Sequence, residues 1–330
     1  MLKKMKIIKL SILRVILTAF VVVYHTFIIY TTYDKSIMGG YIEEYEILER
    51  VINNLTMPIF AAVAGFLYRM QMISGRYEKV SSLLWSKTKR LLIPYFFWSF
   101  LIACLTQKPM LIVNAGSHLW FLVMLFWLFL LCYPLKRLKT LQLALLVILA
   151  MYLRLNVDAK IAFLGLNMLI PMMPYFIIGM LCFDLNKITY SNKTMTNLIK
   201  GLLFFIHFII VYLWVKKVDL VFSHFSYYSL WSIVLAFYVV ILLGTILKYP
   251  SSLTYNGYIE KFDNNSIGIY IIHPIIISCL YKIPTLIIVA QSNPIISPIL
   301  ISIIVFIISY KLSNYFRLHL ANSKWRFVLG

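Results

Sequence analysis

The sequence predicts an all-α integral membrane protein, a polytopic chain with about ten transmembrane helices. Of its 330 residues, 62% are hydrophobic and only 13% are charged, and the mean hydropathy is +0.87. A soluble domain could not bury so much apolar surface. The net charge of +20 would indicate nucleic-acid binding in a soluble protein. Here the basic residues sort to alternate sides of the apolar runs, so we expect no nucleic-acid partner.

Apolar runs of membrane-spanning length recur from one end of the chain to the other. The predicted spans are residues 12–30, 50–68, 90–106, 118–134, 141–154, 167–184, 198–215, 229–247, 266–282 and 294–312. The fifth run is short for a full crossing of the bilayer. No loop is long enough for a separate soluble domain, so we expect a single membrane-embedded domain over residues 1–330.

The distribution of charge predicts the orientation of these spans. Most of the 31 Lys and Arg residues fall in alternate loops that include both ends of the chain, which places both termini in the cytosol. The first outer loop is acidic and amphipathic, as expected of a segment along the outer surface. Its acidic residues are Asp34, Glu43, Glu44, Glu46 and Glu49.

Arg14 and His25 are the most informative residues of the first span. Eleven helical steps place both side chains on one face, with a rise of about 16 Å between them. A titratable group at membrane depth costs about 2.5–3.5 kcal/mol on insertion scales, so it usually marks a site. We therefore predict that His25 is a catalytic base and that Arg14 belongs to the same site.

Each of these residues also has a structural interpretation. His25 could form a structural hydrogen bond to another helix. Arg14, taken alone, could extend its side chain to the lipid phosphates. Their shared face favours an elongated ligand that has an anion at the cytosolic edge and a reactive end beside His25. An acyl-coenzyme A fits this description, because its phosphates lie far from its thioester.

Two further arginines are candidates for the phosphate site. Arg69 closes the second span on the inner side, and Arg90 ends a basic cluster before the third span. Guanidinium groups pair with phosphate through two hydrogen bonds. The alternative to a phosphate site is that these basic residues only mark the cytosolic side, as the positive-inside rule expects. Within the second span, Gly65 permits close approach of another helix.

Candidate acceptor residues lie in the fourth and ninth spans. His118 and Trp120 open the fourth span at the outer face, where they could present a platform for a sugar ring; an interfacial Trp is the ordinary alternative. Tyr270 and His273 share one face of the ninth span, and we predict that they bind the acceptor. The titratable groups are too few and too scattered for a metal site.

Several short motifs follow one another in a fixed order along the whole chain. They are Arg14-x10-His25, Pro58-Ile59-Phe60, Ala64-Gly65-Phe66-Leu67, Arg90-xxx-Pro94-Tyr95, His118-Leu119-Trp120-Phe121-Leu122 and Tyr270-xx-His273. In this order the chain resembles the bacterial membrane acyltransferase-3 family, which O-acylates surface and secreted carbohydrates.

The resemblance implies a ten-helix fold in the bacterial inner or plasma membrane, a cytosolic acyl-CoA donor (usually acetyl-CoA) and a carbohydrate hydroxyl as acceptor. It also implies that Arg14 and His25 are the essential pair. Many relatives have Ser where this chain has Ala64, so an acyl-serine intermediate is not implied here. We also expect this chain to be without the soluble C-terminal domain that some relatives carry.

The function predicted from the sequence is thus carbohydrate O-acylation, for example of an exopolysaccharide. A polysaccharide exporter or flippase without acyl-transfer chemistry is the main alternative, because a polar path between helices would look similar. A third interpretation is a structural partner in the polysaccharide synthesis machinery. The exporter does not require Arg14 and His25 to lie in register, and the structural partner requires neither residue.

Overall fold

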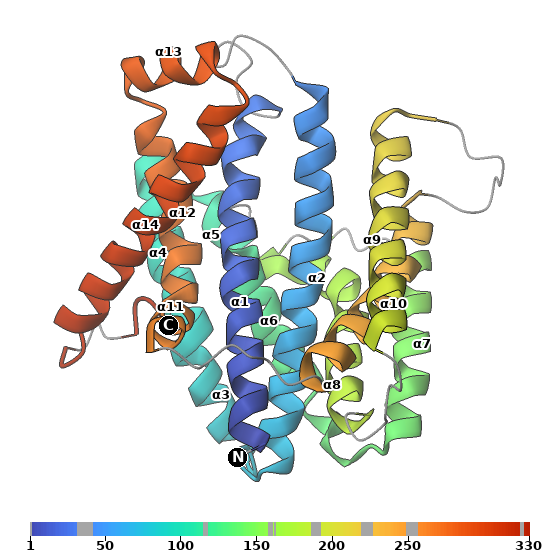
Figure 1. Cartoon of the computed structure of the whole chain (residues 1–330). Coiled ribbons are helices and arrows are strands. Elements are labelled where there is room, and N and C mark those ends of the chain that lie inside the picture. The colour runs from blue at the N-terminus through green and yellow to red at the C-terminus, as the bar shows by residue number, and fades with distance from the viewer. Residues whose placement is uncertain are drawn as a thin grey trace. The chain divides into compact units, whose positions relative to one another are not determined.

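In the computed structural model of the chain, every element of secondary structure among the described residues is a helix (Figure 1). The structure describes residues 2–31, 42–114, 118–157, 161, 163–185, 193–218, 227–248, 257–323 and 327–330. No strand occurs within these ranges. The prediction of an all-α membrane protein is confirmed.

Fourteen α-helices and four shorter helical segments make up the described chain. The α-helices are α1 Leu2–Phe27, α2 Glu43–Ile73, α3 Val80–Lys87, α4 Ile93–Thr106, α5 Met110–Asn114, α6 Trp120–Leu131, α7 Thr140–Asn156, α8 Leu169–Leu185, α9 Lys193–Val215, α10 Tyr227–Lys248, α11 Gly257–Asn264, α12 Ser266–Leu280, α13 Pro284–Ser292 and α14 Ile296–His319. The others are η1 Ile28–Tyr30, the π-helical η2 Thr88–Leu92, η3 Pro134–Arg137 and η4 Phe163–Met168.

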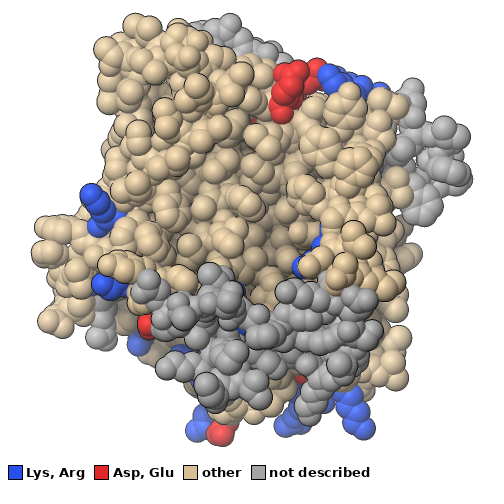
Figure 2. Space-filling model, viewed as in Figure 1, with Lys and Arg blue, Asp and Glu red and all other residues tan. Residues whose placement is uncertain are grey.

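Seven of the described helical stretches are long and apolar enough to cross a membrane, or eight if α12 and α13 count together as one span. The predicted spans at 118–134 and 141–154 correspond to the shorter helices α6 and α7. Most of the face drawn in Figure 2 consists of uncharged residues, as expected of a surface in contact with lipid. The full count of ten crossings stays a prediction.

The ninth predicted span ends in a sharp bend. The axes of α12 and α13 differ by 92°, and α13 lies across the ends of α12 and α14 in Figure 1. The bend falls at Ile283, whose backbone is extended, directly before Pro284. Proline disfavours a helical conformation in the residue that precedes it, so the bend has a local cause.

The described helices group into two compact units. Unit 1 comprises Met1–Met57, Phe204–Ser232 and Ser251–His319, and unit 2 comprises Pro58–Leu203, Ile233–Pro250 and Leu320–Gly330. The helices α2, α9 and α10 begin in one unit and end in the other. The expectation of a single domain over residues 1–330 stays a prediction.

The helices α1, α11, α12 and α14 pack together in unit 1. Their shared core is apolar, and its aliphatic residues Val22, Ile269, Ile277 and Val305 are all buried. Removing such side chains from an apolar core leaves cavities, so this packing holds the four helices in a defined register. The register decides which polar residues of α1 meet those of α11 and α12.

In unit 2, α2 and α8 approach each other closely through two glycines. A Cβ atom on Gly65 would lie 1.9 Å from the carbonyl oxygen of Phe176, and one on Gly179 would lie 1.8 Å from that of Ala62. Neither position has room for any side chain. The predicted role of Gly65 in close helix approach is confirmed.

Candidate active site

Arg14 and His25 both lie on α1, and the helix is continuous between them. The predicted shared face therefore follows from regular helical geometry. Both side chains are half-buried, and both belong to unit 1. Each is held by a residue from the C-terminal third of the chain, as the next contacts show.

Arg14 forms an ion pair with Asp263 of α11. The distance from Arg14 Nη2 to Asp263 Oδ2 is 2.5 Å, and the same nitrogen lies 3.3 Å from Ser11 Oγ. Two further polar atoms of the pair, Arg14 Nε and Asp263 Oδ1, are buried without a protein hydrogen-bond partner. One unused donor and one unused acceptor thus lie at this end of the site, where a polar ligand could satisfy both.

Asp263 was not among the residues singled out in the sequence. It lies three residues before the start of α12, and the chain has only 11 acidic residues against 31 basic ones. A carboxylate at the edge of a predicted span, on the same predicted side as Arg14, was the available signal. Which cation it pairs with depends on how α11 packs against α1.

His25 lies against His273 of α12. The distance from His273 Nε2 to His25 Nδ1 is 3.1 Å, and the ring centroids are 4.7 Å apart. Each Nδ1 also lies beside a carbonyl of its own helix, at 2.9 Å from Val21 for His25 and at 3.0 Å from Ile269 for His273. Two histidines from distant parts of the chain are thus joined edge to edge.

The two histidines differ in exposure. The side chain of His273 is fully buried, whereas that of His25 is partly exposed. A substrate can therefore reach His25 more readily than His273. Tyr24 packs edge-on against His25 with the centroids 4.6 Å apart, and the ring of Tyr270 lies 6.1 Å from that of His273. Of the predicted pair, His273 thus contacts His25 directly, and Tyr270 lies near His273.

Small buried polar groups continue along the same four helices. Ser313 of α14 donates a hydrogen bond to the Oδ1 of Asn265 over 2.8 Å, and both residues are buried. One turn earlier, the Oγ of Ser309 is buried without a hydrogen-bond partner. Buried polar atoms are costly in an apolar region unless they are paired. Buried polar side chains are thus concentrated among α1, α11, α12 and α14, the helix group that contains Arg14 and His25.

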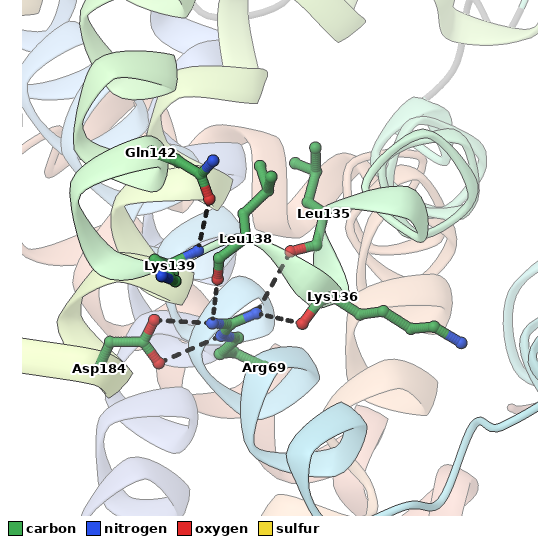
Figure 3. Close-up of polar contacts among 7 residues, drawn as sticks. All are labelled: Arg69, Leu135, Lys136, Leu138, Lys139, Gln142 and Asp184. Carbon is green, nitrogen blue, oxygen red and sulfur yellow. Dashed lines mark hydrogen bonds and ion pairs between the residues drawn. The ribbon is translucent and has the colours of Figure 1, made fainter.

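Arg69 of unit 2 is held entirely by protein atoms (Figure 3). Its Nε and Nη2 contact both oxygens of Asp184, at 3.1 Å and 2.8 Å. The remaining hydrogens go to the backbone carbonyls of Leu135, Lys136 and Leu138 at 2.8–3.3 Å. All five N–H donors of this guanidinium are therefore used. A phosphate could bind only by displacing one of these acceptors, so we leave Arg69 out of the proposed donor site.

Arg90 lies in the π-helical segment η2, and its side chain is exposed. In this segment the N–H of Ile93 bonds to the carbonyl of Thr88, five residues back. The wider turn has a local cause, because Pro94 has no N–H and its ring crowds the carbonyl four residues earlier. Arg14 belongs to unit 1 and Arg90 to unit 2, so a common phosphate site stays a prediction.

His118 and Trp120 lie at the start of α6 in unit 2, and both are half-buried. Trp120 packs edge-on against Phe121, with the ring centroids 5.6 Å apart. The role of this pair in acceptor binding stays a prediction. Among the described residues, no three His, Cys, Asp or Glu side chains come together as a metal site would require.

Comparison with known proteins agrees with these features. The acyltransferase-3 family model, described as an acyltransferase domain, matches residues 7–313. No curated protein and no solved structure matches the chain. The family match covers both Arg14 with Asp263 and His25 with His273. This chain is therefore a member of the acyltransferase-3 family, a multi-pass membrane acyltransferase.

Proposed function

We propose that this protein moves an acyl group, with acetyl as the first candidate, from cytosolic acyl-CoA to a hydroxyl of a cell-surface or exported carbohydrate. The proposed location is the inner or plasma membrane of a bacterium. One observation carries the proposal: a cation and a partly exposed imidazole share one face of α1, and each is held by a polar partner. The family supplies the reaction class.

Arg14 is the proposed anchor of the donor. The rise of about 16 Å along the helix to His25 suits a ligand that has phosphates at one end and a thioester at the other. The unused Nε of Arg14 offers a donor to such a ligand. Arg90 is a second candidate for the phosphates, because its exposed guanidinium lies on the side where the basic loops place the cytosol.

His25 is the proposed general base. Its imidazole takes the proton of the acceptor hydroxyl, whose oxygen attacks the thioester carbonyl. The new C–O bond forms, the C–S bond breaks, and the CoA thiolate leaves with the proton that the imidazolium returns. Direct transfer requires no side-chain nucleophile, which agrees with the presence of Ala64 in the second span.

The acceptor is proposed to enter from the outer side. Tyr270 is a candidate for its orientation, because its ring lies near that of His273, which contacts His25. His118 and Trp120 are further candidates, since aromatic faces and imidazole suit sugar rings. Proteins of polysaccharide synthesis would deliver such an acceptor and are the proposed partners.

Turnover of acyl-CoA by the purified protein in nanodiscs tests this function. Radiolabelled acetyl-CoA is incubated with the wild type, and release of free CoA is followed. We expect His25→Gln and Arg14→Gln to lose this release. His319→Gln and Arg50→Gln are matched controls, because His319 is exposed at the end of α14 and Arg50 pairs with Glu46 of its own helix, so neither contacts Arg14 or His25 in the hydrogen bonds described above. Well-folded wild-type protein that turns over no short acyl-CoA would contradict the proposal.

A cellular measurement separates acylation from export. In cells that carry His25→Gln, we expect the surface polymer to lose its acyl groups while its amount is unchanged. Loss of polymer from the surface, with acylation intact, would instead support an exporter. The family match favours the acyltransferase.

A further inference from the structure

We propose that His273 is a positioning residue that fixes the tautomer and the orientation of the His25 ring, so that Nε2 of His25 is the basic nitrogen. The catalytic consequence rests on the proposed function of His25 as the base. The assignment of the tautomer does not, because it follows from hydrogen bonds within the protein. His273 is fully buried, so we assign it to His25 rather than to direct contact with the acceptor.

The tautomer of His273 follows from its contact with its own helix. Its Nδ1 lies 3.0 Å from the carbonyl oxygen of Ile269. A carbonyl oxygen only accepts hydrogen bonds, so this Nδ1 carries the hydrogen. A neutral imidazole has one N–H, and the lone pair of His273 therefore lies on Nε2.

The lone pair on Nε2 of His273 in turn determines the tautomer of His25. The Nε2 of His273 lies 3.1 Å from the Nδ1 of His25, and an acceptor there requires a donor opposite. The Nδ1 of His25 also lies 2.9 Å from the carbonyl oxygen of Val21. Both neighbours accept, so His25 carries its hydrogen on Nδ1 and shares it between them. Its Nε2 keeps the lone pair and is the nitrogen that can take a proton.

The contact with His273 also stabilises the protonated state of His25. When His25 takes a proton at Nε2, its Nδ1–H bond to His273 becomes a charge-assisted bond, which is about twice as strong as a neutral one. The imidazolium is thus stabilised by a partner already in place. A carboxylate does this work in serine hydrolases. A neutral imidazole costs less to bury in an apolar helix group than a carboxylate does.

The difference in burial between the two rings agrees with His273 as the positioning residue and His25 as the base. His273 is enclosed by packed helices, so its ring cannot turn away from His25. His25 remains partly exposed, so of the two rings it is the one that a substrate can contact. Catalytic groups need such support to stay within a fraction of an ångström of the productive geometry.

Nitrogen NMR of the protein in nanodiscs, labelled in its histidine rings, tests the tautomers directly. His25 and His273 signals are assigned from their loss in His25→Gln and His273→Gln. We expect both rings to be in the Nδ1–H form at a pH where they are neutral. An Nε2–H tautomer at His25 would overturn the assignment, whether or not the protein is an acyltransferase.

Two substitutions of similar size test the catalytic role. The amide oxygen of His273→Gln can accept from His25 Nδ1–H in place of Nε2, whereas His273→Met has no comparable acceptor. We expect His273→Met to lower kcat about 100-fold, with His273→Gln retaining most of it and the donor KM unchanged in both. Equal losses in the two variants would overturn the positioning role. Full activity in His25→Gln would instead contradict the proposed function.

Discussion

Arg69 and Asp184 form a two-point ion pair across 115 positions of the chain, with Nη2–Oδ2 at 2.8 Å and Nε–Oδ1 at 3.1 Å. Arg69 ends the apolar part of α2, and Asp184 lies in the last turn of α8. The same guanidinium also caps the carbonyls of the turn between α6 and α7. One buried cation thus joins three segments of unit 2.

We expect Arg69→Gln to destabilise the protein by about 3–5 kcal/mol, because it leaves Asp184 buried without its cation. The free energy of unfolding in mixed micelles measures this loss. Arg50→Gln is the matched control: Arg50 pairs with Glu46 at a more exposed position, so its loss should stay below about 1 kcal/mol. Equal losses in the free energy of unfolding of the two variants would show that Arg69 does not hold these segments of unit 2 together.

Gly65 and Gly179 should tolerate no side chain. A Cβ at either position would lie within 2 Å of a backbone oxygen, so Gly65→Ala and Gly179→Ala must push α2 and α8 apart. We expect each to cost about 1–3 kcal/mol or more, measured by thermal unfolding. Gly201 of α9 has open space around it, so Gly201→Ala should stabilise its helix by about 0.5–1 kcal/mol. A stabilised Gly65→Ala variant would contradict the close contact.

Arg14 should make donor binding depend on salt. A thioether analogue of acetyl-CoA, which cannot transfer its acyl group, allows the Kd to be measured at several NaCl concentrations. We expect Arg14→Gln to weaken binding about 10- to 100-fold and to reduce the dependence on salt, since a charge-assisted bond is lost. Arg50→Gln should leave both unchanged. An identical salt dependence in Arg14→Gln and the wild type would show that Arg14 does not meet the phosphates.

Lys87 lies in an aromatic cage, and this contact should be measurable by a double-mutant cycle. Its Nζ is 3.6 Å from the ring centroid of Phe129 and 5.3 Å from that of Tyr77. For Lys87→Met and Phe129→Leu we expect a coupling of about 0.5–2 kcal/mol in the free energy of unfolding. Phe126→Leu, at another buried phenylalanine of α6, should give a coupling near zero with Lys87→Met. A coupling near zero at Phe129 would exclude a stabilising cage.

Local sequence was enough to place the long apolar helices, because a long apolar run has few alternatives in a membrane. All described elements are helical, as predicted. The length of a helix does not follow from its apolar run alone: α6 is only 12 residues long, although the predicted span covers residues 118–134. The bend at Ile283 was missed, although the proline that follows it gives the physical reason.

The candidate functional residues also divide into those that the sequence could predict and those that only the packing of helices revealed. Arg14 and His25 could be placed on one face from the sequence, since regular helical geometry fixes their relation. Their partners could not: Asp263 is 249 positions from Arg14, and His273 is 248 from His25. A helical pattern says which side chains share a face but not which other helix that face will meet.

The sequence by itself thus determined the class of protein, the long apolar helices and the face of α1 that carries the two central residues. Each of these depends on hydrophobicity and on the period of a single helix. Only the tertiary structure decided that all donors of Arg69 are already used and that His25 rests against a second histidine. These relations depend on the packing register of separate helices, which complementary side-chain shapes and buried hydrogen bonds determine together.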